Sequence, residues 1–245
     1  MSDTSVSAPS ISIVVPVHDE ADAAVDLARE IAAVFQGRSY EMIFVDDASR
    51  DGTLAELTAA RAELPTLRLL SHSANAGQSR AVRTGVLAAR GAIILTLDGD
   101  GQNPPADGPR LIDALVAAPS DVALVGGRRA RRQDSASKRR ASLWANRIRK
   151  ELLGDDADDT GCGLKAFRRE AFLRLPYFDH LHRYLPALMI REGYRNLYLD
   201  VGHRRRETGR SKYTNWGRLR ASLSDLLGVI WLKRRARNAG DIREI

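Results

Sequence analysis

The sequence predicts an α/β fold built on a mostly parallel sheet. Short apolar, β-branched segments alternate along the first half of the chain with longer segments whose apolar residues recur at helical spacing. Such alternation is typical of parallel βαβ units with helices flanking the sheet. Acidic clusters follow three of the short segments, at the strand ends where an open α/β sheet binds its ligands. These observations predict a ligand site at the carboxyl edge of the sheet.

The predicted strands are rich in Val, Ile and Leu, which is typical of strands buried on both faces. They span residues 11–17, 41–45, 67–71, 92–97 and 121–125. Between the strands, helical spacing begins in several places near Asp, Ser or Thr, the residues that favour helix starts. We therefore predict helices at residues 22–35, 53–63, 77–90 and 107–117.

The second half of the chain is predicted to elaborate the same domain. A basic, helical stretch at 136–153 precedes an acidic loop at 155–159, helices near 178–191 and extended pieces around 197–206. Apolar residues at helical spacing within 219–232 precede a cluster of Lys and Arg, which predicts an amphipathic helix. We divide the chain into a flexible tail (1–10), one α/β domain (11–213) and a basic C-terminal helix and tail (214–245).

Composition excludes several classes of protein. Of the 245 residues 44% are hydrophobic, enough for a substantial core, which excludes disorder throughout. No apolar run approaches the ~20 residues that span a bilayer, and residues 1–10 lack the features of a signal peptide. The single cysteine, Cys162, cannot form an internal disulfide, in agreement with a reducing compartment. We expect a cytoplasmic protein without a transmembrane helix.

Positive charge is concentrated in two segments. Residues 128–150 carry ten Lys or Arg against one Asp, and residues 201–245 carry twelve against four acids, although the whole chain is only +7. A local excess of this kind predicts an anionic partner surface, either phospholipid or nucleic acid. Nucleic acid leaves the acidic clusters unexplained, because carboxylates repel phosphates. We therefore expect an anionic membrane surface and no nucleic-acid partner.

The acidic cluster at residues 97–105 has the pattern of a metal site. On a continuing strand Asp98 and Asp100 share one face, and Gly99 lets the backbone turn without a Cβ clash. Mg²⁺ and Mn²⁺ prefer oxygen ligands and are usually held by one or two carboxylates together with substrate phosphates. An acidic turn remains the alternative for this triplet taken alone, because Asp and Gly favour turns.

Seven segments, in this order, resemble the family 2 glycosyltransferases, and within them the dolichol-phosphate mannosyltransferase-like branch that uses polyprenyl phosphates. The segments are IVVPVHDE, FVDDASRDGT, NAGQSRAVRTG, LDGDGQNPP, DTGCGLKAFRRE, HRYLPAL and RETGRSKY. The resemblance implies a GT-A fold, which is a Rossmann-like, mostly parallel sheet flanked by helices, here with a C-terminal helical elaboration. Two positions depart from the family pattern: Asp19 stands where Asn is usual, and Gly99 where many members have Ala.

Site residues are implied by the same resemblance. The nucleotide-sugar donor would be held by Pro16, His18, Glu20, Val45, Asp47, Asp98, Gly99, Asp100 and Arg129. A cofactor ion, Mg²⁺ or Mn²⁺, would be bound by Asp98, Asp100 and Gln102. The acceptor phosphate would meet Arg129, Arg132, Arg206 and Lys212, and catalysis would depend on Asp100, Asp159, Arg206 and Lys212.

Two of these assignments, and a third residue outside them, keep alternatives. Arg128 is adjacent to Arg129, so the phosphate contact is uncertain by one residue, and a solvated basic face is the other interpretation of either arginine. Asp159 orients the acceptor, takes part in the reaction or caps an acidic loop. Lys165 either reaches a phosphate or is an ordinary surface lysine.

Together these features predict an inverting transfer of one sugar from GDP-mannose or a UDP-sugar to a polyprenyl phosphate. A phosphate monoester with a second pKa near ~6 is already anionic at neutral pH, so the acceptor needs no general base. Inversion follows from direct in-line displacement, as the resemblance implies. Family members often add C-terminal membrane helices, which this sequence does not contain, so we expect a peripheral protein on the cytoplasmic membrane face, with a membrane protein as a possible partner. A nucleic-acid-binding protein and a non-catalytic nucleotide-sugar scaffold are the alternatives.

Overall fold

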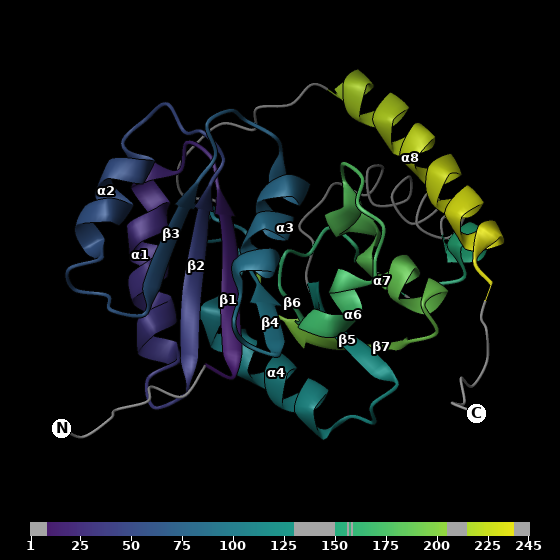
Figure 1. Ribbon diagram of the computed structural model, residues 1–245, viewed down its shortest axis with the longest axis horizontal. Coiled ribbons are helices and arrows are strands. Elements are labelled where there is room, and N and C mark those ends of the chain that lie inside the picture. The colour runs from purple at the N-terminus through teal and green to yellow at the C-terminus, as the bar shows by residue number, and fades with distance from the viewer. Residues whose placement is uncertain (1–8, 130–149, 156, 158, 205–214, 238–245) are drawn as a thin grey trace, which may run out of the picture.

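A computed structural model describes residues 9–129, 150–155, 157, 159–204 and 215–237, with the backbone alone for 215–223. Within these ranges seven strands form one sheet in the order β3-β2-β1-β4-β6-β5-β7 (Figure 1). The strands are β1 (Ile11–Val17), β2 (Tyr40–Asp46), β3 (Leu67–Ser71), β4 (Ile93–Thr96), β5 (Val122–Arg129), β6 (Lys165–Arg168) and β7 (Arg195–Val201). Only β6 among them runs antiparallel to its neighbours. The predicted mostly parallel α/β sheet is therefore confirmed.

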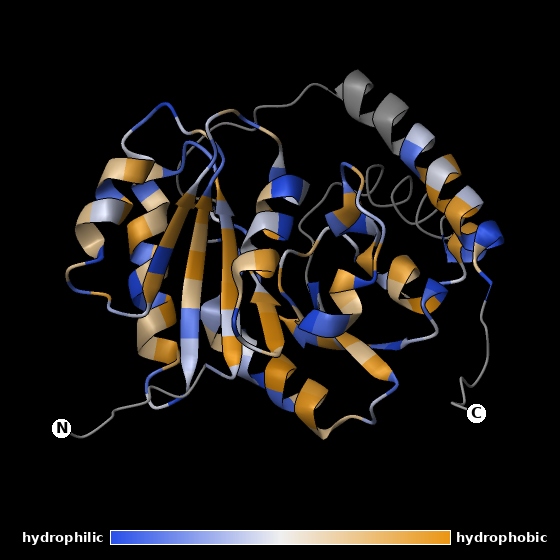
Figure 2. Ribbon diagram, in the orientation of Figure 1, coloured by the Kyte–Doolittle hydropathy of each residue, from blue (hydrophilic) through white to orange (hydrophobic). Residues whose placement is uncertain are grey.

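Helices cover both faces of the sheet. They are α1 (Ala21–Val34), α2 (Thr53–Ala60), α3 (Gln78–Ala88), the 3-10 turn η1 (Pro105–Asp107), α4 (Gly108–Ala117), α6 (Arg169–Leu173), α7 (Leu181–Arg191) and α8 (Asn215–Arg235). Side chains on β1 alternate between the two faces: Ile13 and Val15 pack with α1, α2 and α4, whereas Val14 packs with α3, α6 and α7. Figure 2 shows the resulting apolar strands between amphipathic helices.

The four predicted helices and five predicted strands of the first half are present, with ends that differ by a few residues. Two elements of the second half, β6 and α6, were not predicted. The four residues of β6 begin and end with a cation, so the segment shows no apolar strand pattern. Most of the predicted helical stretch at 136–153 lies outside the described residues, and its last part, residues 150–153, is helical.

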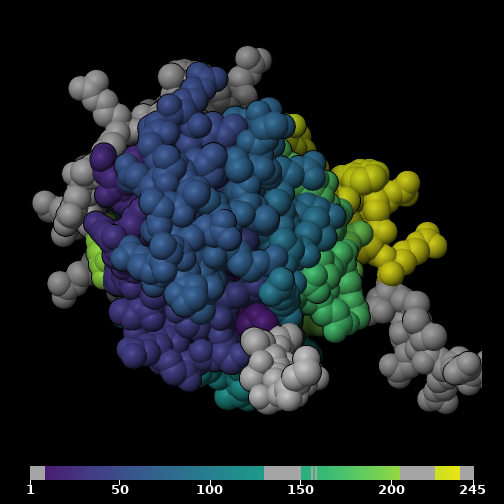
Figure 3. All heavy atoms as spheres, turned by 60° about the vertical axis from the view of Figure 1, so that its left-hand side comes forward, coloured from purple at the N-terminus to yellow at the C-terminus, as the bar shows by residue number. Residues whose placement is uncertain are grey.

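The last helix, α8, lies against α7. Its yellow residues lie at the edge of the molecule in Figure 3. Val229 is fully buried in the apolar cluster that contains α7, whereas Leu227 and Trp231 on the outer side are each 60% exposed. None of the helices in the described ranges has both the length and the apolar character that crossing a bilayer requires.

Candidate active site

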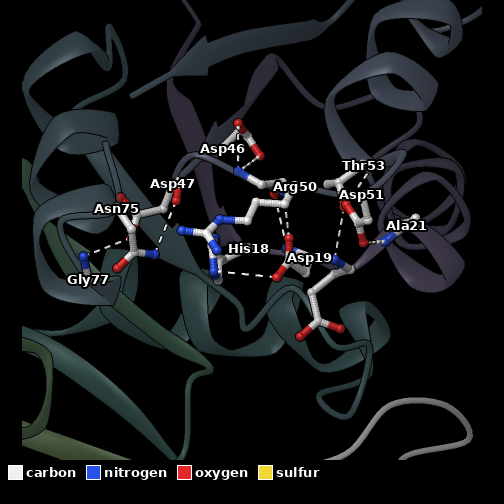
Figure 4. Close-up of polar contacts among 12 residues, drawn as sticks. His18, Asp19, Ala21, Asp46, Asp47, Arg50, Asp51, Thr53, Asn75 and Gly77 are labelled. Carbon is white, nitrogen blue, oxygen red and sulfur yellow. Dashed lines mark hydrogen bonds and ion pairs between the residues drawn. The ribbon is translucent and has the colours of Figure 1, made fainter. Parts of the chain in front are cut away.

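Three acidic strand ends meet at one edge of the sheet, as the sequence predicts. Val17 at the end of β1 pairs with Asp46 at the end of β2, so the residues that follow both strands lie side by side (Figure 4). After β4 the chain passes directly over the end of β1. A Cβ on Gly99 would come within 2.8 Å of the Pro16 carbonyl oxygen, so an alanine at this position would require the backbone to shift.

Asp19 joins the loops after β1 and β2. Its backbone is left-handed, with a φ of 52°, a conformation that Asn and Asp tolerate better than other side chains that carry a Cβ. The Asp19 main-chain N–H donates to Ser49 Oγ at 2.9 Å, and its carboxylate accepts from the Arg50 N–H at 2.7 Å. The replacement of Asn by Asp therefore preserves this turn. Beside it, Asp51 accepts from the N–H groups of Thr53 and Ala21, which makes it a turn and cap residue.

The ends of β1 and β2 and the loops that follow them hold five of the nine residues predicted to bind the nucleotide sugar. The Nδ1 atom of His18 is buried and has no hydrogen-bond partner among the described residues, and its predicted contact with a nucleotide stays a prediction. Glu20 is half-buried, and its N–H donates to Thr53 Oγ1. Pro16 is buried, and Val45 is fully buried among apolar side chains beneath α3. The side chain of Val45 therefore faces the core.

Asp47 is 3% exposed and is surrounded by N–H donors. Its Oδ1 accepts from the Ala76 N–H at 2.9 Å and lies 2.7 Å from His72 Nδ1, while its Oδ2 accepts from the Gly77 N–H at 2.7 Å. The other ring nitrogen of His72 lies 2.9 Å from Thr84 Oγ1. The carboxylate thus anchors the turn that precedes α3, and its predicted contact with a nucleotide remains a prediction.

The Asp98 carboxylate is held from several sides. Gln78 Nε2 donates to Oδ1 at 2.8 Å, and Asn103 Nδ2 donates to Oδ2 at 3.3 Å. Behind it lies Gly163, where a Cβ would come within 2.3 Å of the carboxylate oxygen. Asp100 accepts from the Gln102 N–H at 3.1 Å.

The charges around Asp98 suit a divalent cation. Burial and the negative charge of Asp100 raise the pKa of Asp98, while Lys165, the Gln78 hydrogen bond and Arg129 act in the opposite direction. A cation between the two carboxylates would remove their mutual repulsion. In the described part of the chain no group of three or more His, Cys, Asp and Glu side chains is arranged to hold a metal. Mg²⁺ is usually held by one or two carboxylates completed by phosphate oxygens and water, so Asp98 and Asp100 stay its predicted ligands.

Arg129 and Asp159 form a bidentate, largely buried ion pair. Arg129 Nε lies 2.6 Å from Asp159 Oδ2 and Nη2 lies 2.7 Å from Oδ1, and this pairing raises the pKa of Arg129. Arg128 instead points to Asp200 on β7, at 2.6 Å. The charge of Arg129 also acts on Asp98. Which of the two arginines contacts a phosphate stays a prediction.

Other predicted phosphate contacts, Arg132, Arg206 and Lys212, lie outside the described residues. Arg204, at the end of a described range, donates its N–H to the Gln102 carbonyl at 2.9 Å and forms an ion pair with Glu30. The segment after β7 therefore reaches the predicted metal site.

Lys165 is a buried residue of the site, 5% exposed, so the surface interpretation is wrong. Its Nζ donates to the Cys162 carbonyl oxygen. Burial lowers the pKa of Lys165, and the nearby thiol and carboxylates, Asp98 among them, oppose this shift. Lys165 and His182 line a cavity of about 20 Å³ behind Asp98, large enough for one water molecule. Burial also lowers the pKa of His182 well below 6.5, and its Nδ1 lies 2.7 Å from Ser79 Oγ.

Sequence reasoning assigned no role to Gln78, Gly163 or His182, although all three lie in or next to the quoted segments. These residues lie 20 to 84 residues from Asp98 in the chain, so only the folded structure shows that they are close to it. A larger hollow of about 620 Å³ lies between α1 and α2 and contains none of the predicted site residues.

Comparison with known protein families decides the assignment. A family model described as "Glycosyl transferase family 2" matches residues 12–175, about two thirds of the chain. The chain belongs to glycosyltransferase family 2. The matched range of this family model includes the predicted donor-binding and metal-binding residues at the ends of β1, β2 and β4.

Similar curated proteins include undecaprenyl-phosphate sugar transferases. The chain is 35% identical over 215 residues to the undecaprenyl-phosphate 4-deoxy-4-formamido-L-arabinose transferase of Sodalis glossinidius, covering 86% of this chain and 65% of the relative. It is 35% identical to the transferase of the same name from Klebsiella pneumoniae strain 342, covering 83% and 62%. The chain thus spans just under two thirds of the length of these relatives.

Solved structures of low sequence identity share the fold. Glucosyl-3-phosphoglycerate synthase from Mycobacterium tuberculosis, in complex with phosphoglyceric acid, superposes with a TM-score of 0.68 at 17% identity and covers 95% of this chain and 82% of its own. A mannosyltransferase from Pyrobaculum calidifontis, in complex with GDP-Man and Mn²⁺, gives a TM-score of 0.65 at 20% identity, covering 96% and 67%. The GT-A fold expected for the family is therefore confirmed.

Proposed function

We propose that the chain is a glycosyltransferase that moves one sugar from a nucleotide sugar to a polyprenyl phosphate, with inversion and with help from Mg²⁺ or Mn²⁺. The observation that carries this proposal is the pair Asp98 and Asp100 at the carboxyl edge of the sheet, where the negative charge of Asp100 acts on Asp98. The description of the relatives as undecaprenyl-phosphate sugar transferases supports the acceptor class.

The residues of the site divide the work by charge. Asp98, Asp100 and Gln102 would hold the divalent cation, which supplies Lewis-acid stabilisation of the departing diphosphate when bound. His18 and Glu20 would contact the nucleotide beyond the end of β1. Asp159 keeps the Arg129 guanidinium in a fixed orientation, as a bidentate carboxylate partner does, and from there Arg129 would meet the diphosphate.

The acceptor phosphate requires cations and no base. It would meet Arg129 and, beyond the described residues, Arg132, Arg206 and Lys212. Because a phosphate monoester is anionic at neutral pH, attack on the sugar needs only alignment and charge neutralisation. The ion pair with Arg129 leaves Asp159 as an orienting group for this arginine rather than as a proton acceptor.

A lipid acceptor also requires access to a membrane surface. The outer side of α8 presents Leu227 and Trp231, and its last turn carries Lys233, Arg234 and Arg235. Apolar side chains beside cations suit the headgroup region of an anionic membrane. We include this surface of α8 in the proposal as the membrane contact.

Purified protein provides the direct test. Incubation with Mn²⁺, a panel of GDP- and UDP-sugars and a short-chain polyprenyl phosphate should yield a lipid-linked sugar, detected by mass spectrometry. Asp100→Ala should abolish the product, whereas Asp22→Ala, an exposed aspartate on α1, should retain it. Absence of product with every donor, or full activity in the presence of a chelator, would contradict the proposal.

A further inference from the structure

The carboxylate of Asp98 is in contact with a residue to which the site chemistry gives no role. Gln78, the first residue of α3, places its amide Nε2 2.8 Å from Asp98 Oδ1. An ionised carboxylate only accepts hydrogen bonds, so the Gln78 amide must be the donor. With Asn103 on the other oxygen and Gly163 behind, this contact fixes the orientation of the carboxylate.

The position of Gln78 is itself set by the turn at residues 75–77. Gly77 has a φ of 86°, and its N–H and that of Ala76 both donate to the Asp47 carboxylate. Asn75 Nδ2 donates to the Asp47 carbonyl oxygen at 3.1 Å. These contacts tie the start of α3 to the end of β2, and Asp47, Asn75 and Gly77 are labelled at the left of Figure 4.

Resting on the proposed function, we infer that Gln78 is a positioning residue that orients Asp98 for a divalent cation, and that Asp47 sets Gln78 through this turn. Partners behind a metal ligand fix its rotamer before the ion arrives, and their loss typically weakens metal binding by about 10–100-fold. If Gln78 served only to begin α3, its side-chain amide would not be needed, because the first position of a helix does not require an amide side chain.

His72 allows a separate test of the role of Asp47, because His72 contacts Asp47 but neither Gln78 nor Asp98. Its ring links the Asp47 carboxylate to Thr84 on α3, at 2.7 and 2.9 Å. Removal of this donor loosens the carboxylate that holds the turn. An asparagine at position 72 retains an N–H donor near the place of Nδ1.

Titration with Mn²⁺ alone, followed by electron paramagnetic resonance, tests the inference without a sugar donor. Gln78→Met keeps the length of the side chain and removes the donor, so Mn²⁺ affinity should fall by about 10–100-fold while the melting temperature stays unchanged. Gln36→Met, the same change at an exposed position after α1, is the matched control and should leave both values unchanged. His72→Leu should weaken Mn²⁺ binding in the same direction, and His72→Asn should restore it.

Unchanged Mn²⁺ affinity in Gln78→Met, or an equal loss in Gln36→Met, would overturn the role of Gln78. Unchanged affinity in His72→Leu would overturn the role of Asp47 as its anchor. Absence of Mn²⁺ binding by the wild-type protein would overturn the inference as a whole. Failure of the proposed function gives a different result, namely intact Mn²⁺ binding that depends on Gln78 without any transfer of sugar.

Discussion

Gly163→Ala should disable the metal site through a single methyl group. A Cβ at this position would lie 2.3 Å from an Asp98 carboxylate oxygen, whereas ordinary contacts begin at 3.4 Å. The carboxylate or the backbone must therefore move by about 1 Å, and Thr96 Oγ1, which donates to the Gly163 carbonyl at 2.8 Å, resists movement of the backbone. A displacement of about 1 Å at a reacting centre costs on the order of 10²-fold in rate, about 2.7 kcal/mol.

The assay measures Mn²⁺ affinity, kcat/KM for sugar transfer and thermal stability of the same variant. We expect weaker Mn²⁺ binding, a fall in kcat/KM of about 10²-fold, and a loss of about 1–3 kcal/mol in the free energy of unfolding from overpacking. Gly228→Ala in α8 is the control, because its Cβ meets open space and a helical alanine should add up to about 1 kcal/mol of stability. Wild-type Mn²⁺ affinity in Gly163→Ala would refute the steric argument.

Acid stability should depend on Glu41, since burial alone would raise its pKa but hydrogen bonds from a serine, a main-chain N–H and Arg68 outweigh burial and lower it. The stabilisation by the ionised Glu41 is complete above the unfolded-state pKa of about 4.3 and is lost as pH falls through the lower folded-state pKa. Glu41→Gln should therefore lower the free energy of unfolding by about 2 kcal/mol at pH 7 and make it fall less in acid. Urea unfolding at several pH values checks this, and an acid limb as steep as that of wild type would contradict it. Burial raises the pKa of the Cys162 thiol, so a disulfide reagent should modify it only after unfolding, and rapid modification of the native protein would contradict this. Replacement of Leu227 and Trp231, each 60% exposed, by serine should weaken binding to anionic phospholipid vesicles about tenfold or more at constant melting temperature. Full binding of this double variant in a sedimentation assay would exclude α8 as the membrane contact.

Local pattern predicts most of the first half of the fold. Strands buried on both faces need runs of apolar, β-branched residues, and this requirement makes β1, β2, β4 and β5 visible in the sequence. The edge strand β3 is visible from its three leucines. The sequence does not predict β6, because one of the four residues of this strand, Lys165, is a buried cation. The strand is stabilised by antiparallel pairing with β4 and β5. Such pairing joins segments that are tens of residues apart.

By itself, the sequence determined the type of chemistry: an acidic DGD segment after a buried strand, two further acidic strand ends and localised basic segments. Only the tertiary structure decided which side chains contact one another in the site. It placed Arg129 on Asp159, Gln78 on Asp98 and the Gly163 backbone against the same carboxylate. The physical reason is that periodicity and turn chemistry act over a few residues, whereas side-chain orientation depends on which distant segments the packed sheet brings within hydrogen-bond distance.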